Sequence, residues 1–185
     1  MWRLLQAAAL AGLVSLCGCS TIDRVRLDSV RVGVGRAEGR VHDGRYAATV
    51  VVPQARFDLS GLVPLPVGRV VSIVEPFAGY IEEPKRGMEA GLCTMVRYEV
   101  DVHGITPYVE GGAGPMYLGI DTREQGKAGF NFMNQIGAGV RLSIDDHLSL
   151  EAGYQYRHIS HAGLRDSQNH GIETHMGIIG LALKF

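Results

Sequence analysis

The chain has 185 residues and a formal net charge of −1, and charged residues make up 20% of the sequence. This balance excludes a strongly basic nucleic-acid-binding protein and a highly charged disordered chain. After residue 18 no apolar run approaches the roughly 20 residues that a helix needs to cross a bilayer, which excludes a multi-span helical membrane protein. Membrane-spanning β-strands give a much weaker sequence signal and are not excluded.

The first residues carry the pattern of an export signal. Arg3 is followed by a short apolar stretch over 4–16 and then by small residues, which is the order typical of a signal peptide. Residues 16–19, Leu-Cys-Gly-Cys, resemble a bacterial lipobox, which predicts a lipoprotein-type signal peptide over 1–18 and lipidation of Cys19. Ordinary signal-peptidase cleavage nearby is the alternative. In lipoproteins of this kind, a serine such as Ser20 after the lipidated cysteine favours transfer to the outer membrane.

The remainder of the chain, 19–185, is interpreted as a single all-β domain. It contains no segment of sufficient length with the apolar periodicity of a helix, and apolar and polar residues alternate instead. Most expected strands exceed the about five or six residues usual in globular sheets and match the roughly ten needed to cross a bilayer at a tilt. Strands are expected over 29–37, 46–58, 67–81, 88–102, 105–118, 130–144, 147–160 and 173–185.

This even number of long strands predicts an eight-stranded antiparallel transmembrane β-barrel of the outer membrane. With the N-terminus in the periplasm, the periplasmic turns fall at 59–66, His103-Gly104 and Asp145-Asp146, all containing turn-forming residues. The opposite loops are expected to be polar and longer on average, around 38–45, 82–87, 119–129 and 161–172. A soluble β-sandwich or a lipocalin-like barrel is the alternative, but neither explains strands of this length.

The last two expected strands show the clearest alternation. One face of 148–160 carries leucine, alanine and tyrosine, and suits lipid, whereas the other carries serine, glutamate, glutamine and arginine, and suits a polar interior. In 173–185 the apolar face ends on Phe185. A terminal phenylalanine after alternating apolar residues resembles the C-terminal signature of outer-membrane barrels.

Three polar side chains fall on this lipid-facing surface near its outer rim. His158 and Ser160 continue the apolar face of their strand, because residues i and i+2 project to the same side. Glu173 lies on the outer face of the next strand, which returns antiparallel and brings it beside His158. His175, one step inward on the same face, is expected to line the site or to be an interfacial polar residue. An uncompensated polar group in an apolar setting costs a few kcal/mol, which disfavours chance placement.

Serine, histidine and glutamate are the parts of a nucleophile, a general base and an orienting carboxylate. Histidine takes the serine proton as the oxygen attacks a carbonyl, and the carboxylate keeps the other ring nitrogen protonated. We therefore predict a catalytic triad of His158, Ser160 and Glu173. The scheme requires no metal or other cofactor.

The segment 156–164, Tyr-Arg-His-Ile-Ser-His-Ala-Gly-Leu, followed by Asn169 and by Gly-Ile-Glu over 171–173, resembles the active-site hairpin of the lipid A 3-O-deacylases, the PagL family. The resemblance covers about 105–185, and the N-terminal half matches only in strand pattern. It implies an outer-membrane serine esterase that removes the ester-linked 3-hydroxyacyl chain at position 3 of lipid A, remodelling lipopolysaccharide. The implied roles are nucleophile for Ser160, base for His158 and orienter for Glu173.

One residue departs from the family pattern. The family usually has asparagine directly after the nucleophile, associated with the oxyanion hole, and this chain has His161 there. Gly163 matches a family glycine whose backbone N–H is implicated in the same hole. The resemblance therefore implies an oxyanion hole at His161 and Gly163, with the His161 ring as a possible donor in place of the amide. Loss of one oxyanion donor can lower the rate by about 10²–10³.

Cations occur in each expected outer loop, at Arg40, Arg45, Lys85, Arg86, Arg123, Lys127 and Arg165. Lipid A carries phosphates, which arginine and lysine bind. Arg165, nearest the triad, is the best candidate, and ordinary solvated loop charge is the alternative for each residue.

The sequence also leaves other functions open. A zinc site among the histidines is a rival interpretation, but His158 and His161 point to opposite faces of a strand and metal-ligand spacing is absent. A non-enzymatic small barrel with a structural or adhesion role, and an esterase acting on another lipid, are the alternative functions. The expected partners are lipid A and the outer membrane, without nucleic acid, and a homodimer is left open.

Overall fold

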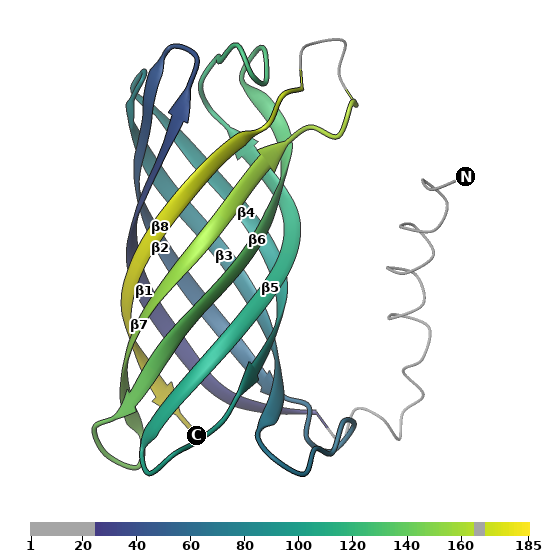
Figure 1. Cartoon of the computed structure of the whole chain (residues 1–185), viewed down its shortest axis with the longest axis vertical. Helices are drawn as coiled ribbons and strands as arrows, with labels where there is room; N and C mark the ends of the chain where they lie inside the picture. The colour runs from purple at the N-terminus through teal and green to yellow at the C-terminus, as the bar shows by residue number, and fades with distance from the viewer. Residues whose placement is uncertain (1–24, 165–168) are drawn as a thin grey trace.

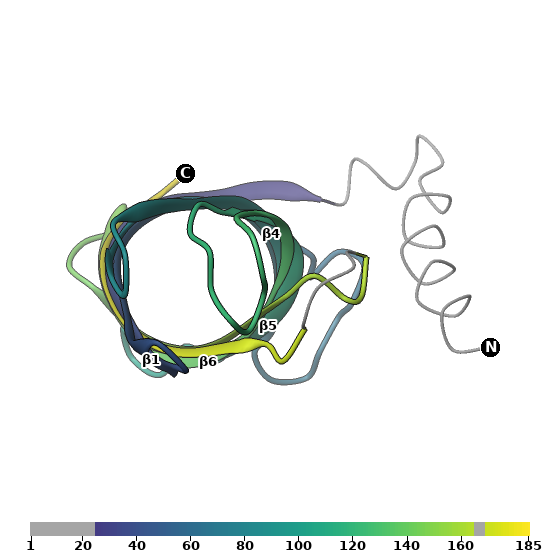
Figure 2. The same ribbon diagram turned by 90° about the horizontal axis from the view of Figure 1, so that it is seen from above.

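The structure is a computed structural model and describes residues 25–164 and 169–185. It forms a closed barrel in which each strand pairs antiparallel with the next and β1 pairs with β8 (Figure 1, Figure 2). The strands are β1 Arg26–Val41, β2 Gly44–Asp58, β3 Arg69–Glu83, β4 Gly87–Glu99, β5 Ile105–Leu118, β6 Gly129–Ser143, β7 Leu148–Ser160 and β8 Ile172–Lys184. In the described part of the chain no helix is long and apolar enough to span a membrane.

The eight expected strands are confirmed, and most boundaries agree within a few residues. The largest difference is the first outer loop, where a long connection over 38–45 was expected. Only His42 and Asp43 separate β1 from β2, because pairing continues to Val41 and Gly44. The prediction of a long loop here was wrong. Polar residues at the exposed end of a hairpin resemble a loop in the sequence even when their backbones are paired as strands.

The turns at the opposite end, where β1 begins and β8 ends, agree better with the sequence. His103 and Gly104 have φ of +55° and +84° between the bridged Val102 and Ile105, the backbone signs of a type I′ hairpin turn. The Asp145 carboxylate accepts the backbone N–H groups of Leu148 (2.7 Å) and His147 (2.8 Å). These hydrogen bonds hold the pKa of Asp145 below its usual value, so the carboxylate remains charged and caps the turn.

Alternation along the strands separates an apolar exterior from a polar interior. On β8, Ile179, Leu181 and Leu183 are exposed at 65%, 53% and 46%, which suits contact with lipid chains rather than water. The interior side chains include fully buried arginines and carboxylates. The side chains that fill the barrel therefore need partners among themselves.

The largest interior ion cluster is centred on Glu151. Its Oε2 lies 2.6 Å from Nη2 of Arg56 and 3.2 Å from Nε of Arg31, and its Oε1 lies 3.5 Å from Nη1 of Arg97. One carboxylate of β7 thus joins arginines from β1, β2 and β4 across the barrel. An eight-stranded barrel has an interior just wide enough for side chains to fill, so this network serves as its packed core.

Candidate active site

The predicted triad residues lie at the outer end of β7 and β8, away from the strand ends where β1 begins and β8 finishes (Figure 1). His158 of β7 and Glu173 of β8 are direct cross-strand partners. Ser160 is two residues beyond His158 on the same strand and is the partner of Phe132 on β6. Arg157 and Ile159 are buried, and because side chains alternate along a strand, His158 and Ser160 face the outside of the barrel. Both are half-buried there, and Glu173 is exposed.

A glycine supports the His158 ring. Gly171 has φ of +79°, and a Cβ placed on it would lie 2.4 Å from the His158 Cε1 atom. The imidazole therefore rests directly against the backbone that leads into β8. This position requires glycine both because of its backbone conformation and because of the ring above it.

Gly171→Ala is expected to displace the His158 ring and, if the predicted triad is catalytic, to lower its hydrolytic activity by about tenfold or more, because small misplacements of catalytic groups are costly. The barrel itself should form, since Gly171 precedes the first residue of β8. Hydrolysis rate and the heat-dependent gel shift of the folded barrel measure the two effects. Gly177→Ala, within β8, is the matched control, because a Cβ there meets no atom within 4 Å. Equal activity of the two variants would contradict the role of Gly171.

A row of polar and aromatic side chains continues from Glu173 along the outer face. The Tyr156 phenol lies near the Glu173 carboxylate and interacts with it. His175 lies between two tyrosines, with ring centroids 5.6 Å from Tyr156 and 5.9 Å from Tyr154, and its Nδ1 is hydrogen-bonded to the Tyr154 hydroxyl. His175 is thus next to the candidate site and beside the two tyrosines of the same outer face.

Sequence reasoning missed one polar neighbour of His158. Asn134 of β6 is the cross-strand partner of His158 on the side opposite Glu173, and it is exposed on the outer face. The row across three strands is therefore Asn134, His158 and Glu173. The signal was present in the sequence, because an asparagine two residues before the outward-facing Ile136 interrupts an apolar face.

The segment after Ser160 forms a tight turn. The His161 carbonyl accepts the Leu164 N–H at 3.0 Å, and the intervening Ala162 and Gly163 have φ of +52° and +74°. Gly163 is exposed beside the end of β7. Its backbone N–H as an oxyanion donor stays a prediction.

His161 is fully buried, unlike Ser160. Its backbone N–H donates to Oε1 of Gln125 and to Oδ1 of Asn169, both at 3.1 Å. The structure therefore ties the residue after the candidate nucleophile to the β5–β6 loop, and does not bring its ring to the outer face beside Ser160. Arg165, the residue predicted to bind phosphate, lies outside the described residues, as do the signal segment 1–18 and Cys19.

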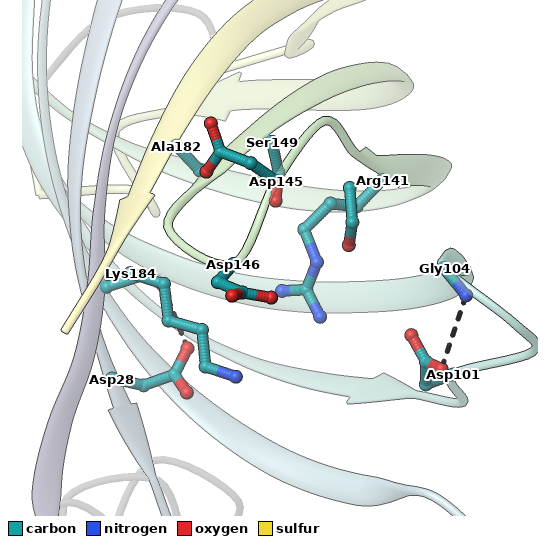
Figure 3. A pocket seen from close by; sticks show the side chains of 11 residues that line it. Asp28, Asp101, Gly104, Arg141, Asp145, Asp146, Ser149, Ala182 and Lys184 are labelled. Carbon is teal, nitrogen blue, oxygen red and sulfur yellow. Dashed lines mark hydrogen bonds between the residues drawn. The ribbon is translucent and has the colours of Figure 1, made fainter.

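A separate polar pocket lies at the opposite end of the barrel (Figure 3). It is lined by Asp28, Asp101, Asp145 and Asp146 together with Arg141 and Lys184, and its described lining residues include no histidine. Asp28 is already engaged by Arg69 (2.6 Å), and Asp101 by Thr106 (2.9 Å). The pocket also contains serines, and the Ser29 hydroxyl donates to the Asp28 carboxylate at 2.9 Å, but the described lining offers them no histidine as a general base. Among the described residues, no group of three or more histidine, cysteine or acidic side chains is placed to hold a metal ion.

Comparison with known proteins decides the family. The family model described as lipid A 3-O-deacylase (PagL) matches residues 66–182, a range that runs from before β3 almost to the end of β8 and contains His158, Ser160 and Glu173. The chain belongs to the PagL family. The sequence resemblance is thus confirmed, and this PagL-family chain is an outer-membrane β-barrel. The match begins further upstream than the motif-bearing segment that the sequence had indicated.

Solved structures share the fold of this PagL-family chain. A crystal structure of the outer-membrane enzyme PagL has a TM-score of 0.57 and 21% identity, covering 80% of this chain and 97% of that one. Neisserial surface protein A has a TM-score of 0.64 and 13% identity, covering 87% and 99%. Ail, the attachment invasion locus protein of Yersinia pestis, has a TM-score of 0.56 and 12% identity, covering 86% and 99%. A search of curated proteins found no match to the sequence.

Proposed function

We propose that this chain hydrolyses the ester-linked 3-hydroxyacyl chain at position 3 of lipid A, with Ser160 as nucleophile, His158 as general base and Glu173 as orienting carboxylate. The observation that carries the proposal is the register of β7 and β8, in which His158 and Glu173 are direct partners and Ser160 follows His158 on the same outer face. Membership of the lipid A 3-O-deacylase family supports the substrate and the class of reaction.

In the proposed first step, His158 removes the Ser160 hydroxyl proton as the oxygen attacks the ester carbonyl. The tetrahedral intermediate collapses, the bond to the sugar oxygen breaks, and His158 returns the proton to that oxygen. Water then attacks the acyl-enzyme with His158 again as base, releasing a 3-hydroxy fatty acid and restoring the serine. Glu173 holds one imidazole nitrogen protonated throughout, and the Tyr156 phenol lies near the same carboxylate.

The outward placement of these residues explains how a filled barrel acts on a lipid. The interior is occupied by buried ion clusters such as that of Glu151, so the substrate approaches from the leaflet rather than from the lumen. Lipid A lies in the outer leaflet with its acyl chains beside the barrel wall. A site at the rim of the apolar belt meets the ester bond where the chains join the sugar.

The oxyanion hole of this chain is proposed to use the Gly163 backbone N–H rather than a side-chain amide at position 161. Gly163 lies in the exposed turn that follows Ser160. The His161 N–H is already bound to Gln125 and Asn169. Its proposed part is to hold this turn in place.

The test is expression in a Gram-negative host without such an activity, followed by mass spectrometry of its lipid A. We expect lipid A lighter by one 3-hydroxyacyl group, the appearance of the free 3-hydroxy fatty acid, and retention of the acyl chains attached at other positions. Unchanged lipid A in cells that hold the folded barrel would contradict the proposal. Release of acyl chains from phospholipids instead would assign the esterase to another lipid.

A further inference from the structure

A groove opens beside Glu173, between the outer end of the β1–β2 hairpin and β8. We name it the hairpin groove; it is lined by Glu38, Gly39, Arg40, Arg45, Glu173 and His175. β8 and β1 are neighbours in the closed barrel, with Glu38 opposite His175 and Gly39 opposite Thr174. A molecule in this groove would contact the carboxylate proposed to orient His158.

The groove lies just beyond the apolar belt. On the outer face of β1, the exposed Val32 and Val34 are followed by Arg36, Glu38 and Arg40. The same change occurs on β8, because Val34 is opposite Ile179 whereas Glu38 is opposite His175. Charged side chains replace apolar ones at the level where lipid headgroups replace acyl chains. The hairpin groove is therefore at headgroup depth.

The groove carries two arginines, Arg40 and Arg45, together with the carboxylates of Glu38 and Glu173. Arg40 and Arg45 are direct cross-strand partners, and like charges placed opposite each other on a sheet repel. Glu38 forms ion pairs with Arg45 and, at 3.4 Å, with Arg36, so this carboxylate is already shared. In the described part of the chain Arg40 is in no ion pair. An anion bound between the two guanidinium groups would give Arg40 an ionic partner and would add to the Glu38 carboxylate that Arg45 shares with Arg36.

We infer that the hairpin groove binds a phosphate of the glycolipid headgroup through Arg40 and Arg45, and so places the ester bond near Ser160. The ligand in this inference rests on the proposed function, since lipid A is the phosphorylated lipid in question. Guanidinium groups bind phosphate oxygens in pairs of parallel hydrogen bonds, which fixes orientation as well as affinity. The site adds two residues from the N-terminal part of the barrel, which lies outside the range matched by the family model.

Gly39 allows this arrangement. A Cβ at position 39 would lie 2.1 Å from the Glu173 carbonyl oxygen. The hairpin and the start of β8 therefore approach each other closely only because the residue is glycine. This contact holds the groove and the candidate triad at a constant separation.

The test measures binding to purified Ser160→Ala protein in detergent micelles, so that no substrate is consumed. The probes are diphosphorylated lipid A, the same lipid with its phosphates removed, and inorganic phosphate. We expect the parent protein to bind phosphorylated lipid A more tightly than the lipid without phosphates. The double variant Arg40→Gln with Arg45→Gln should bind the phosphorylated lipid about tenfold more weakly, so that the two lipids bind equally. Lys85→Gln with Arg86→Gln, on the β3–β4 turn at the same end of the barrel, is the matched control and should have little effect.

Equal weakening by the two double variants would overturn the inference, because it would indicate only general attraction of charge. Displacement of the lipid by low millimolar inorganic phosphate would overturn the assignment to a headgroup and indicate a free-phosphate site. Folding of each variant is checked by the heat-dependent gel shift. With Ser160 intact, the arginine variants should raise KM for phosphorylated lipid A, whereas the Lys85 and Arg86 control should not. If the intact protein binds but hydrolyses no lipid A, the proposed function fails and the groove inference stands.

Discussion

Ser160→Ala is expected to lower the release of 3-hydroxy fatty acid from lipid A by roughly 10³-fold or more, because removal of a triad nucleophile leaves only binding and oxyanion stabilisation. Ser160 lies at the last position of β7 with its side chain on the outer face. Loss of one hydroxyl there removes no interior contact, so the barrel should fold as before. The measurement is the rate of fatty acid release by purified protein in mixed micelles.

Ser72→Ala provides the control for this experiment. Ser72 is also half-buried on the outer face, but on β3, away from β7 and β8. Its removal makes the same chemical change to the lipid-facing surface and should leave the rate unchanged. A Ser160→Ala protein as active as the parent would show that another residue is the nucleophile, whereas loss of activity in both variants would point to a general effect on the surface.

Glu151→Gln is expected to have the largest effect on stability. The fully buried Glu151 carboxylate contacts Arg31, Arg56 and Arg97, and its neutralisation leaves three guanidinium groups close together in the interior. Breaking a buried ion pair by removing one partner costs about 3–5 kcal/mol. The free energy of unfolding, measured by urea titration in lipid vesicles and followed by circular dichroism, should fall by about that amount.

The control for this variant is Glu82→Gln. Glu82 forms an ion pair with Arg36 at 2.5 Å on the exposed outer surface, and exposed pairs contribute little to stability. The two variants remove the same charge, but only one removes it from the interior. Equal unfolding midpoints for Glu151→Gln and the parent would show that the arginines find other partners, and that the interior cluster is not the source of stability.

Much of the fold was predictable because the side-chain period of a strand is local. The alternation over 148–160 identifies both the strand and its lipid-facing side, and the positions of His158 and Ser160 follow from it directly. The His103-Gly104 turn was equally accessible, since its backbone conformation depends on those two residues. Glu173 could be placed beside His158 because consecutive strands of the barrel pair antiparallel, so the start of one strand lies beside the end of the strand before it.

Other features of the site depend on contacts between residues of different strands and loops, which the alternation along a single strand does not specify. Asn134 reaches His158 through the β6–β7 register, and the support of the His158 ring by Gly171 depends on the path of the chain into β8. The engagement of His161 by Gln125 requires the β5–β6 loop to lie near the end of β7. The sequence motif alone therefore left open a role for the His161 ring, and the structure shows that His161 is buried.

The sequence by itself determined that the chain is an outer-membrane barrel and which side chains face lipid, because alternation of period two is encoded residue by residue. Tertiary structure decided which residues meet: the shared carboxylate of Glu151, the hairpin that carries Arg40 and Arg45 next to Glu173, and the row from Asn134 to Glu173. These contacts join residues distant in the chain. They are set by strand register and by the closure of β1 on β8, and no local pattern specifies either.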